Sequence, residues 1–493
     1  MNRASLVPWL AIALLTLALM TPALLRPPMT HDSFWIDIGW ADQFTAEMRR
    51  GVLWPRWLPQ SHGGLGAPVF YFYPPLAFWI TGVFGLAGLA TWPSLLAAFA
   101  TLLAASGGAV YLWLRDLGAR ALPGALLYMA LPYHLFDFYR RGALAEFASF
   151  AVLPLVALAL RRAGDGRGFG WLAVSYCALI LTHLPMALLA SLFLVGPYSI
   201  HLVVARRDAI APIAFGLTAG LGLSAAYLVP ALSLQHAIAI DQLWAMGQYQ
   251  AGRWSIWHPE QWASPAGMQL TFTLAGVLAI AAIVGLRGRG TFWSLLALAT
   301  VAIVLGVVPG LWSLPLLAKA QFPWRALAVV ELALVTALAL APLRPLLLAI
   351  ATTPALMLSV LFLKPVVLPD LLAPADILAR HHDVPEYLPA GAPADRFWYS
   401  KWALDLAARQ PPRVTANGIT TLRRFDFPAW QVRCGDRIVA HFPHPETRLL
   451  SWRGKDCSIS RIATGAERIG RALSAFALIA LVARLVVGHR HRG

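Results

Sequence analysis

Apolar runs of about 18 residues or more recur along this chain, and no other feature constrains the fold as strongly. A run of that length can cross the hydrocarbon core of a bilayer as one helix. Hydrophobic residues make up 59% of the chain and charged residues 13%, with a mean hydropathy of +0.64. These values exclude an ordinary soluble protein and predict an all-α polytopic membrane protein.

We expect about twelve transmembrane helices, with both chain ends in the cytoplasm. The predicted spans lie near residues 5–25, 93–114, 121–138, 146–162, 169–184, 186–205, 210–233, 269–286, 291–309, 325–342, 345–363 and 469–488. The first span lacks a convincing cleavage site, so it is expected to be a retained signal anchor. Arginine clusters between the spans, such as Arg115/Arg120 and Arg206/Arg207, mark the cytoplasmic side by the positive-inside rule. The net charge of +16 therefore reflects topology, and no nucleic-acid partner is expected.

The first outer loop and its flanks, residues 26–92, are long and polar for a connection between spans. They contain a further apolar run at 70–88. If that run crossed the bilayer, Arg115 and Arg120 would lie outside and every later loop would be reversed against the charge bias. We therefore expect 70–88 to form a juxtamembrane or re-entrant helix. Residues 33–50 are expected to form a second surface helix. Its apolar stripe consists of Phe34, Ile38, Ala41, Phe44 and Met48.

Three regions are predicted. Residues 1–363 form the transmembrane domain, and its other outer loops are 139–145, 234–268 and 310–324. Residues 364–468 alternate short apolar and polar stretches between Gly, Pro and Asp breaks, which predicts a small β-rich extracytoplasmic domain. Within it, Cys434 and Cys457 are expected to form a disulfide if the domain faces an oxidising compartment. Residues 469–493 supply the last span and a basic cytoplasmic tail.

Several segments together resemble a known family. They are THDSFWIDIGWADQF, WPRWLPQSHGGLGAPVFYFYPP, FYRRGALAEF, LTHLP, QFPWRAL and FDFPAWQV. The chain resembles the bacterial membrane family labelled "6-pyruvoyl-tetrahydropterin synthase-related" over nearly its full length. The pterin label does not fit these residues, because the clustered histidines of a zinc-dependent pterin synthase are missing from the sequence. A first span followed by an acidic outer loop, juxtamembrane helices and a charged second outer loop resembles the C-type glycosyltransferase (GT-C) fold of oligosaccharyltransferases and protein mannosyltransferases.

The resemblance implies an inverting glycosyltransferase that takes a sugar from a polyprenyl-phosphate donor and passes it to a cell-envelope acceptor. The site would face the exterior or periplasm from the bacterial cytoplasmic (inner) membrane. Such a reaction needs a carboxylate to accept the proton of the acceptor. Asp32 is the first choice, because it follows the first span where the fold carries its first catalytic acid, although it could instead cap the helix that begins at Ser33. In the second outer loop, Asp137 and Glu146 compete for the role of the second acid.

The leaving phosphate also needs cations to neutralise it. The candidates for binding the substrate or the lipid phosphate are His31, Arg56, Arg140, Arg141, Arg253, His258 and Arg325. Arginine is suited to this role because its planar guanidinium binds phosphate with two parallel hydrogen bonds. The competing interpretation is that these residues are interfacial anchors within an aromatic belt. His183, in a tight hairpin, is expected to satisfy backbone groups, and the alternative is a ligand or proton carrier.

No cofactor is required by the residue pattern. The scattered acids could hold one divalent ion, but no compact ligand spacing demands it. Two other classes of function stay open, a non-catalytic scaffold in envelope polysaccharide assembly and a transporter or flippase. A transporter should carry charged or helix-breaking residues in mid-membrane and often an internal repeat, whereas the charges here gather at the ends of spans.

Overall fold

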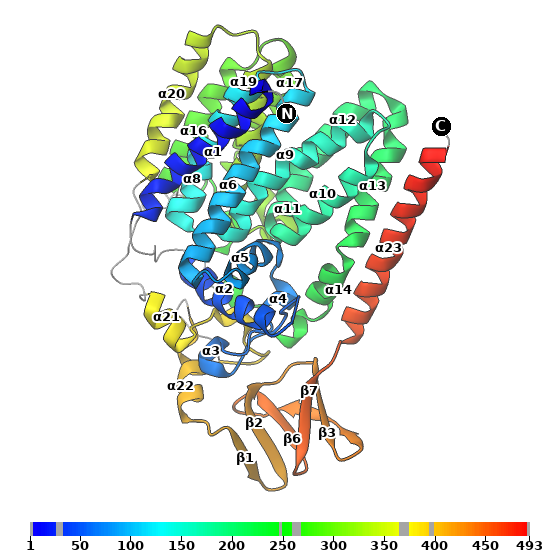
Figure 1. The fold of residues 1–493 in the computed structure, drawn as a ribbon. Coiled ribbons are helices and arrows are strands. Elements are labelled where there is room, and N and C mark those ends of the chain that lie inside the picture. Colours follow the sequence, from blue (N-terminus) through cyan, green and yellow to red (C-terminus); the bar gives the residue numbers. More distant parts are fainter. Residues whose placement is uncertain are drawn as a thin grey trace.

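The computed structural model describes residues 3–25, 33–245, 249–258, 268–363, 374–393 and 399–490. A tall bundle of helices forms most of the molecule, and two small β sheets lie at one end of it (Figure 1). Both ends of the described chain lie toward the opposite end of the bundle. This arrangement is consistent with a membrane domain that carries a β domain on one side.

The bundle contains both long and short helices. They are α1 (Arg3–Leu24), α6 (Thr91–Asp116), α7 (Ala121–Ala130), α8 (Pro132–Phe136), η1 (Asp137–Arg141), α9 (Leu144–Gly164), α10 (Phe169–Thr182), α11 (Leu184–Ala190), η2 (Ser191–Val195), α12 (Gly196–Ala205), η3 (Arg207–Ala209), α13 (Ile210–Leu223), α14 (Ala225–Ser233), α16 (Met268–Val284), η8 (Gly288–Gly290), α17 (Thr291–Val304), α19 (Leu327–Leu340), α20 (Pro345–Phe362) and α23 (Gly465–Arg490).

Seven helices in the described part of the chain are long and apolar enough to cross a membrane, or eight if the bent pair α13 and α14 is one span. The expected twelve spans are therefore not confirmed. The predicted span 121–138 is broken, since Leu131 is extended and Pro132 starts a new helix. Helices α10 and α17 have 14 residues each, which gives about 21 Å against a hydrocarbon core of about 30 Å. An apolar run in the sequence does not show where its helix breaks.

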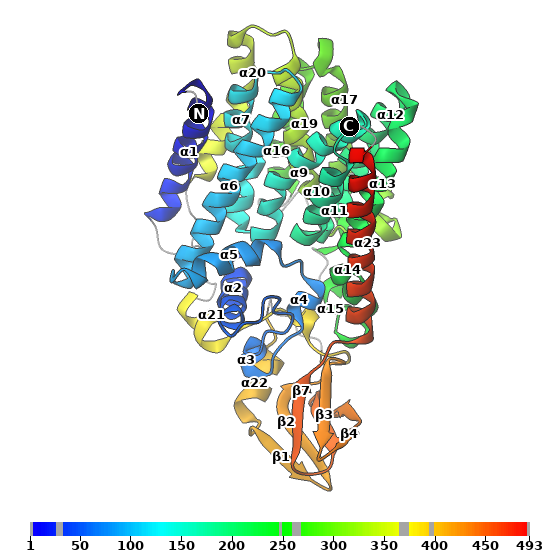
Figure 2. The ribbon, with the colours of Figure 1, turned by 45° about the vertical axis from the view of Figure 1, so that its right-hand side comes forward.

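A layer of short elements covers one end of the bundle (Figure 2). It consists of α2 (Phe34–Arg49), α3 (Ser61–Gly64), α4 (Val69–Phe72), α5 (Leu76–Leu86), η4 (Gln235–Ala237), α15 (Gln242–Ala245), η6 (Ala251–Arg253), η9 (Leu311–Ser313), α18 (Pro315–Ala318), η10 (Pro323–Ala326), α21 (Pro374–Arg380), η11 (Pro385–Tyr387) and α22 (Lys401–Arg409). Helix α5 has 11 residues, about 17 Å, which is too short to cross a bilayer. It packs on α2 and α6, as the juxtamembrane interpretation of 70–88 requires.

Helix α2 forms where the sequence predicts it, but its environment differs from the prediction. The expected apolar stripe is buried except for Met48, which is partly buried. Trp40 and Gln43 are buried as well, because α21 packs against α2 and because Gln43 accepts the backbone N–H groups of Gln60 and Ser61. Trp40 donates its indole N–H to Asp383 at 3.0 Å. The helix is thus enclosed between the bundle and other elements of the layer, instead of having one face in water.

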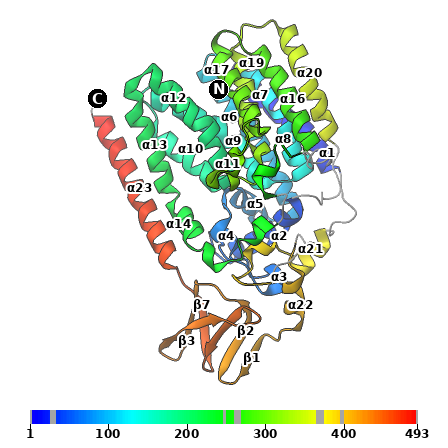
Figure 3. The same ribbon diagram turned by 180° about the vertical axis from the view of Figure 1, so that it is seen from behind.

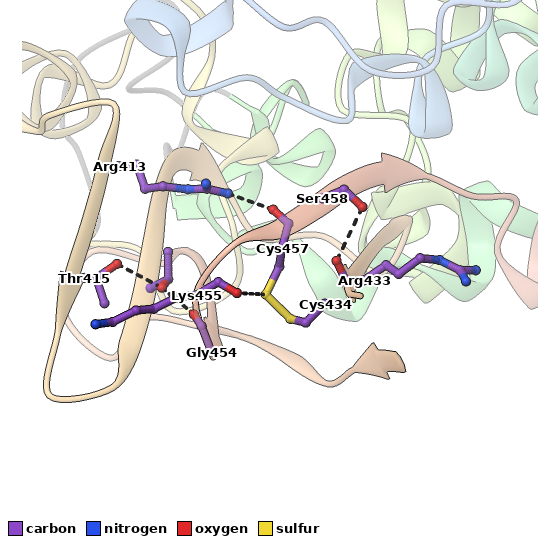
Figure 4. Close-up of a disulfide and its surroundings, with 9 residues drawn as sticks. Arg413, Thr415, Arg433, Cys434, Gly454, Lys455, Cys457 and Ser458 are labelled. Atoms are coloured by element: carbon purple, nitrogen blue, oxygen red, sulfur yellow. Dashed lines mark hydrogen bonds between the residues drawn. A yellow bond between two sulfur atoms is a disulfide. The ribbon is translucent and has the colours of Figure 1, made fainter. Parts of the chain in front are cut away.

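The β domain consists of two antiparallel sheets (Figure 3). The strands are β1 (Arg413–Ala416), β2 (Ile419–Phe425), β3 (Trp430–Cys434), β4 (Arg437–Val439), β5 (His441–Pro443), β6 (Leu449–Arg453) and β7 (Cys457–Arg461), in the orders β1-β2-β6-β5 and β4-β3-β7. Cys434 and Cys457 face each other on β3 and β7 and form a disulfide (Figure 4). The predicted cysteine pair is present, but the strands occupy only the later part of the predicted β-rich region 364–468. Its earlier part contains the helices α21 and α22, which pack against α2 and α3.

Replacing Cys434 and Cys457 together by serine is expected to destabilise the β domain. The two cysteines are 23 positions apart, and closing a loop of that length stabilises by roughly 3 kcal/mol in the chain-entropy model. The urea midpoint of the domain, followed by limited proteolysis, should fall accordingly. The matched control is Cys177→Ser, which removes the free cysteine in α10 and should leave that midpoint unchanged. Two free thiols in protein purified without reductant would contradict the prediction.

Candidate active site

The second outer loop forms a tight turn between two helices of the bundle. The π-helical turn η1 ends at Gly142, which adopts a left-handed backbone conformation with φ 59°. A side chain at this position would overlap the ring of Phe34, so glycine is needed both for the backbone and for the close approach of α2. Helix α9 then begins at Leu144 and places Glu146 in its first turn, where the helix dipole favours a carboxylate.

Four ionic side chains meet at this turn, and we name Asp137, Arg141, Glu146 and Arg325 the buried ion network. Arg141 Nη1 lies 2.9 Å from Asp137 Oδ1 and 2.6 Å from Glu146 Oε2. Arg325 Nε lies 2.9 Å from the same Glu146 oxygen. None of the four residues is more than 7% exposed. The two carboxylates and two guanidinium groups balance in charge, which is what makes their burial tolerable.

The carboxylate of Glu146 is fully occupied. Its Oε1 accepts a hydrogen bond from the Tyr133 hydroxyl, while Oε2 receives both arginines. A carboxylate held in this way is a poor choice for accepting the proton of a substrate. Its geometry suits the positioning of Arg141 and Arg325.

Helix α2 is docked onto the same turn. Asp37 Oδ2 accepts the backbone N–H of Leu144 at 3.0 Å and so caps α9. The Ser33 N–H donates to the carbonyl of Arg141 at 3.0 Å. His31 and Asp32 lie outside the described residues, so their distance from Glu146 is not defined. The described contact nevertheless joins the residue after Asp32 to the buried ion network.

Tyr73 is a residue of this region that the sequence interpretation missed. Its phenol is half-buried and interacts electrostatically with Asp37, Arg325 and Glu146. Burial raises the pKa of this phenol well above its usual value, and the charges of Asp37 and Glu146 act in the same direction. A neutral hydroxyl can donate a hydrogen bond to a sugar or phosphate oxygen. Tyr73 belongs to the aromatic run FYFYPP, and such runs are typical of the membrane interface, so the sequence offers no reason to assign it to a site.

Two outer loops meet around a pocket of about 450 Å³, which we name the basic pocket. Arg253, His258 and Lys319 line it, with Gln250, Trp312 and Ser313 among its other walls. The predicted phosphate candidates Arg253 and His258 thus share one cavity, and Lys319 was not predicted. Only the fold brings Lys319 to them, because it comes from the loop before QFPWRAL, whereas the other two come from 234–268.

The basic pocket and the buried ion network are connected through one short segment. Arg325 Nη1 donates to the carbonyl of Ala320 and to Gln321 Oε1, at 3.0 Å each. These residues directly follow Lys319 in the wall of the pocket. Phe322 stacks on Trp324 and lies under the Arg325 guanidinium, 4.9 Å from ring centroid to Cζ. Displacement of Arg325 would therefore be transmitted to the pocket wall.

The other predicted site residues lie elsewhere. Arg140 is only partly exposed and donates to the carbonyl of Leu361 at the end of α20. Arg56 pairs with Glu467 at 3.2 Å and lies over the Trp54 ring, so it ties the first outer loop to α23. Burial lowers the pKa of Arg56 to about 10, which leaves it charged at neutral pH. His183 accepts the N–H of Met186 and caps α11, as expected of a hairpin histidine.

In the part of the chain that the structure describes, no three or more His, Cys, Asp or Glu side chains form a cluster able to hold a metal ion. The neighbouring acids of the second loop are already paired with arginines.

No protein-family profile matches the chain, and no curated protein matches it. Among solved structures, it is similar to the arabinofuranosyltransferase AftD from Mycobacteria, with 18% identity and a TM-score of 0.45, over 74% of this chain and 27% of that one. A mutant of the same protein gives 17% identity and a TM-score of 0.48, over 75% and 28%. This chain therefore spans about a quarter of the length of those structures.

Proposed function

We propose that this chain is an inverting membrane glycosyltransferase that moves a sugar from a polyprenyl-phosphate donor to a cell-envelope acceptor. The reaction takes place on the side of the membrane that carries the β domain, facing the periplasm or exterior of a bacterial cytoplasmic membrane. One observation carries the proposal: the basic pocket and the buried ion network meet at the same end of the bundle, linked through residues 319–325. The positive-inside rule disfavours arginine and lysine on the outer side of the membrane. Binding of a lipid phosphate would explain why these cations are found on that side.

The proposed chemistry is a single displacement. The phosphate of the donor binds Arg253, His258 and Lys319 in the basic pocket. A hydroxyl of the acceptor attacks the anomeric carbon from the opposite side, the bond from that carbon to the phosphate oxygen breaks, and the phosphate leaves with the electron pair. The proton of the attacking hydroxyl passes to Asp32. Support for Asp32 comes from its neighbour Ser33, which hydrogen-bonds to Arg141 of the buried ion network.

The remaining acids have a positioning role in this scheme. Glu146 holds Arg325, and Asp137 shares Arg141 with it. Arg325 in turn holds the segment that carries Lys319. The half-buried Tyr73 hydroxyl is a donor for a sugar or phosphate oxygen.

The deciding experiment identifies lipid-linked sugars in a deletion strain. Loss of the transferase should make one polyprenyl-phosphate sugar accumulate, and the purified full-length protein should transfer that sugar in detergent or nanodiscs. If nothing accumulates and no transfer occurs, the chain is instead a scaffold. In that case the buried ion network would have a purely structural role, because a fold can keep paired buried charges for stability alone.

Lys319→Ala is expected to raise the KM for the donor about ten- to a hundredfold, with kcat nearly unchanged. A hydrogen bond to a charged group contributes about 1.5–3 kcal/mol, and a contact present equally in substrate and transition state affects KM alone. Steady-state kinetics with the accumulated lipid donor would measure this. Lys401→Ala, an exposed lysine at the start of α22, is the matched control and should behave as wild type. An unchanged KM in the Lys319→Ala variant would contradict the binding of the donor phosphate in the basic pocket.

A further inference from the structure

A second, apolar cavity lies on the outside of the bundle, between α13, α14 and α23, and we name it the α23 groove. It has a volume of about 540 Å³, within the usual range of about 300–1,000 Å³ for ligand sites. Its walls include Phe215 and Thr218 on α13, Leu228 on α14, and Phe476 and Ala480 on α23. The hydroxyl of Thr218 donates a hydrogen bond to the carbonyl of Ala214 within the same helix, so the walls of the groove are apolar.

The groove follows from the break between α13 and α14. The two helices meet at 62°, and the break between these two apolar helices frees backbone groups that need hydrogen-bond partners. Ser474 of α23 supplies them, since its Oγ donates to the Leu223 carbonyl at 2.8 Å and accepts the Ala226 N–H at 2.9 Å. The bend is therefore fixed by α23, and the groove is a built feature of the fold.

The mouth of the groove faces away from the protein. Phe476 is 71% exposed and Leu232 is 63% exposed, although both line the cavity. Figures 1 and 3 show α23 along the outer side of the bundle, beside α13 and α14. In a membrane, such a surface faces hydrocarbon chains.

A cation marks one end of the groove. The guanidinium of Arg484 lies 4.6 Å from the ring centroid of Phe215, a wall residue, and 5.7 Å from that of Phe169. Arg484 is exposed, and among the described residues it has neither a carboxylate nor a hydrogen-bond acceptor. Contacts with two aromatic rings do not use the N–H donors of the guanidinium as hydrogen bonds to an oxygen would. A phosphate matches these donors in charge and in geometry.

We infer that the α23 groove binds an anionic phospholipid, with one hydrocarbon chain in the groove and the phosphate on Arg484. Arg484 is six positions before the last residue of α23, and that end of the helix is remote from the β sheets (Figure 1), so this lipid belongs to the leaflet opposite the β domain. The polyprenyl donor has its phosphate on the other side of the membrane and is a different ligand. This site does not depend on the proposed reaction.

The test is native mass spectrometry of the full-length protein in detergent, titrated with phosphatidylglycerol or with phosphatidylcholine of the same chains. We expect one phosphatidylglycerol to bind at least about tenfold more tightly than phosphatidylcholine, since a charge-assisted contact to phosphate is lost or screened in the zwitterionic lipid. Arg484→Gln should remove this preference, while Arg484→Lys should keep part of it. Equal binding of the two lipids to the wild-type protein would overturn the inference.

Two further variants separate the head group from the chain. Thr218→Trp fills the groove and should weaken phosphatidylglycerol about as much as Arg484→Gln does. Arg468→Gln is the matched control, an exposed arginine on α23 at the end near the β sheets, and should bind the lipid as wild type does. Glycerol phosphate, which has the head group without chains, should not compete. Competition by glycerol phosphate, or equal losses in the Arg468→Gln and Arg484→Gln variants, would show binding by surface charge and reject the groove.

Discussion

Asp32→Asn is expected to abolish sugar transfer while expression and folding stay close to normal. An amide cannot accept the proton of the acceptor at neutral pH, and general-base catalysis contributes about 100- to 10,000-fold. If Asp32 were only a helix cap, asparagine would replace it with a stability loss below about 1 kcal/mol and no loss of activity. The two roles therefore predict different results for the same variant.

The measurement combines complementation of the deletion strain with protein level, melting temperature and, once the donor is known, kcat. Asp405→Asn is the matched control, because Asp405 is an exposed carboxylate on α22 in the outer layer. It should complement fully. A well-expressed Asp32→Asn protein that also complements fully would reject Asp32 as the base and return the role to Glu146 or Asp137.

Glu146→Gln is expected to destabilise the protein by about 3–5 kcal/mol, because breaking a buried ion pair leaves an uncompensated buried charge. Arg141 keeps Asp137 as its partner, whereas Arg325 loses its only carboxylate among the described residues. Adding Arg325→Gln should therefore restore part of the lost stability. The melting temperatures of the single and double variants in detergent measure both effects.

A surface pair provides the comparison for this prediction. Glu47 pairs with Arg50 at 2.6 Å, but the Arg50 side chain is 64% exposed. Solvent screens such a pair, so Glu47→Gln should cost less than about 1 kcal/mol. If the Glu146→Gln and Glu47→Gln proteins melt alike, the buried ion network does not hold the second outer loop, and its proposed positioning role fails with it.

The sequence by itself determined the class of the protein and its local elements. The apolar runs are too long and too frequent for any solvent other than a bilayer, so the membrane class follows from composition alone. The helical spacing of Phe34, Ile38 and Ala41 predicted α2, and the alternating residues within 364–468 predicted strands, which the structure contains from Arg413 to Arg461. These features depend on residues close together in the chain, which is why a linear pattern reveals them.

The tertiary structure decided which helices break and which charges meet. Hydropathy measures the cost of placing each residue in hydrocarbon, and it carries no information on where a backbone break will find new hydrogen-bond partners, as the break after Leu223 does at Ser474. The cost of burying a charge likewise depends on its partner. Glu146 and Arg325 are 179 positions apart, and Lys319 joins Arg253 only when two loops fold together. Pairing across such distances is set by packing, so only the folded chain shows that these side chains form one site.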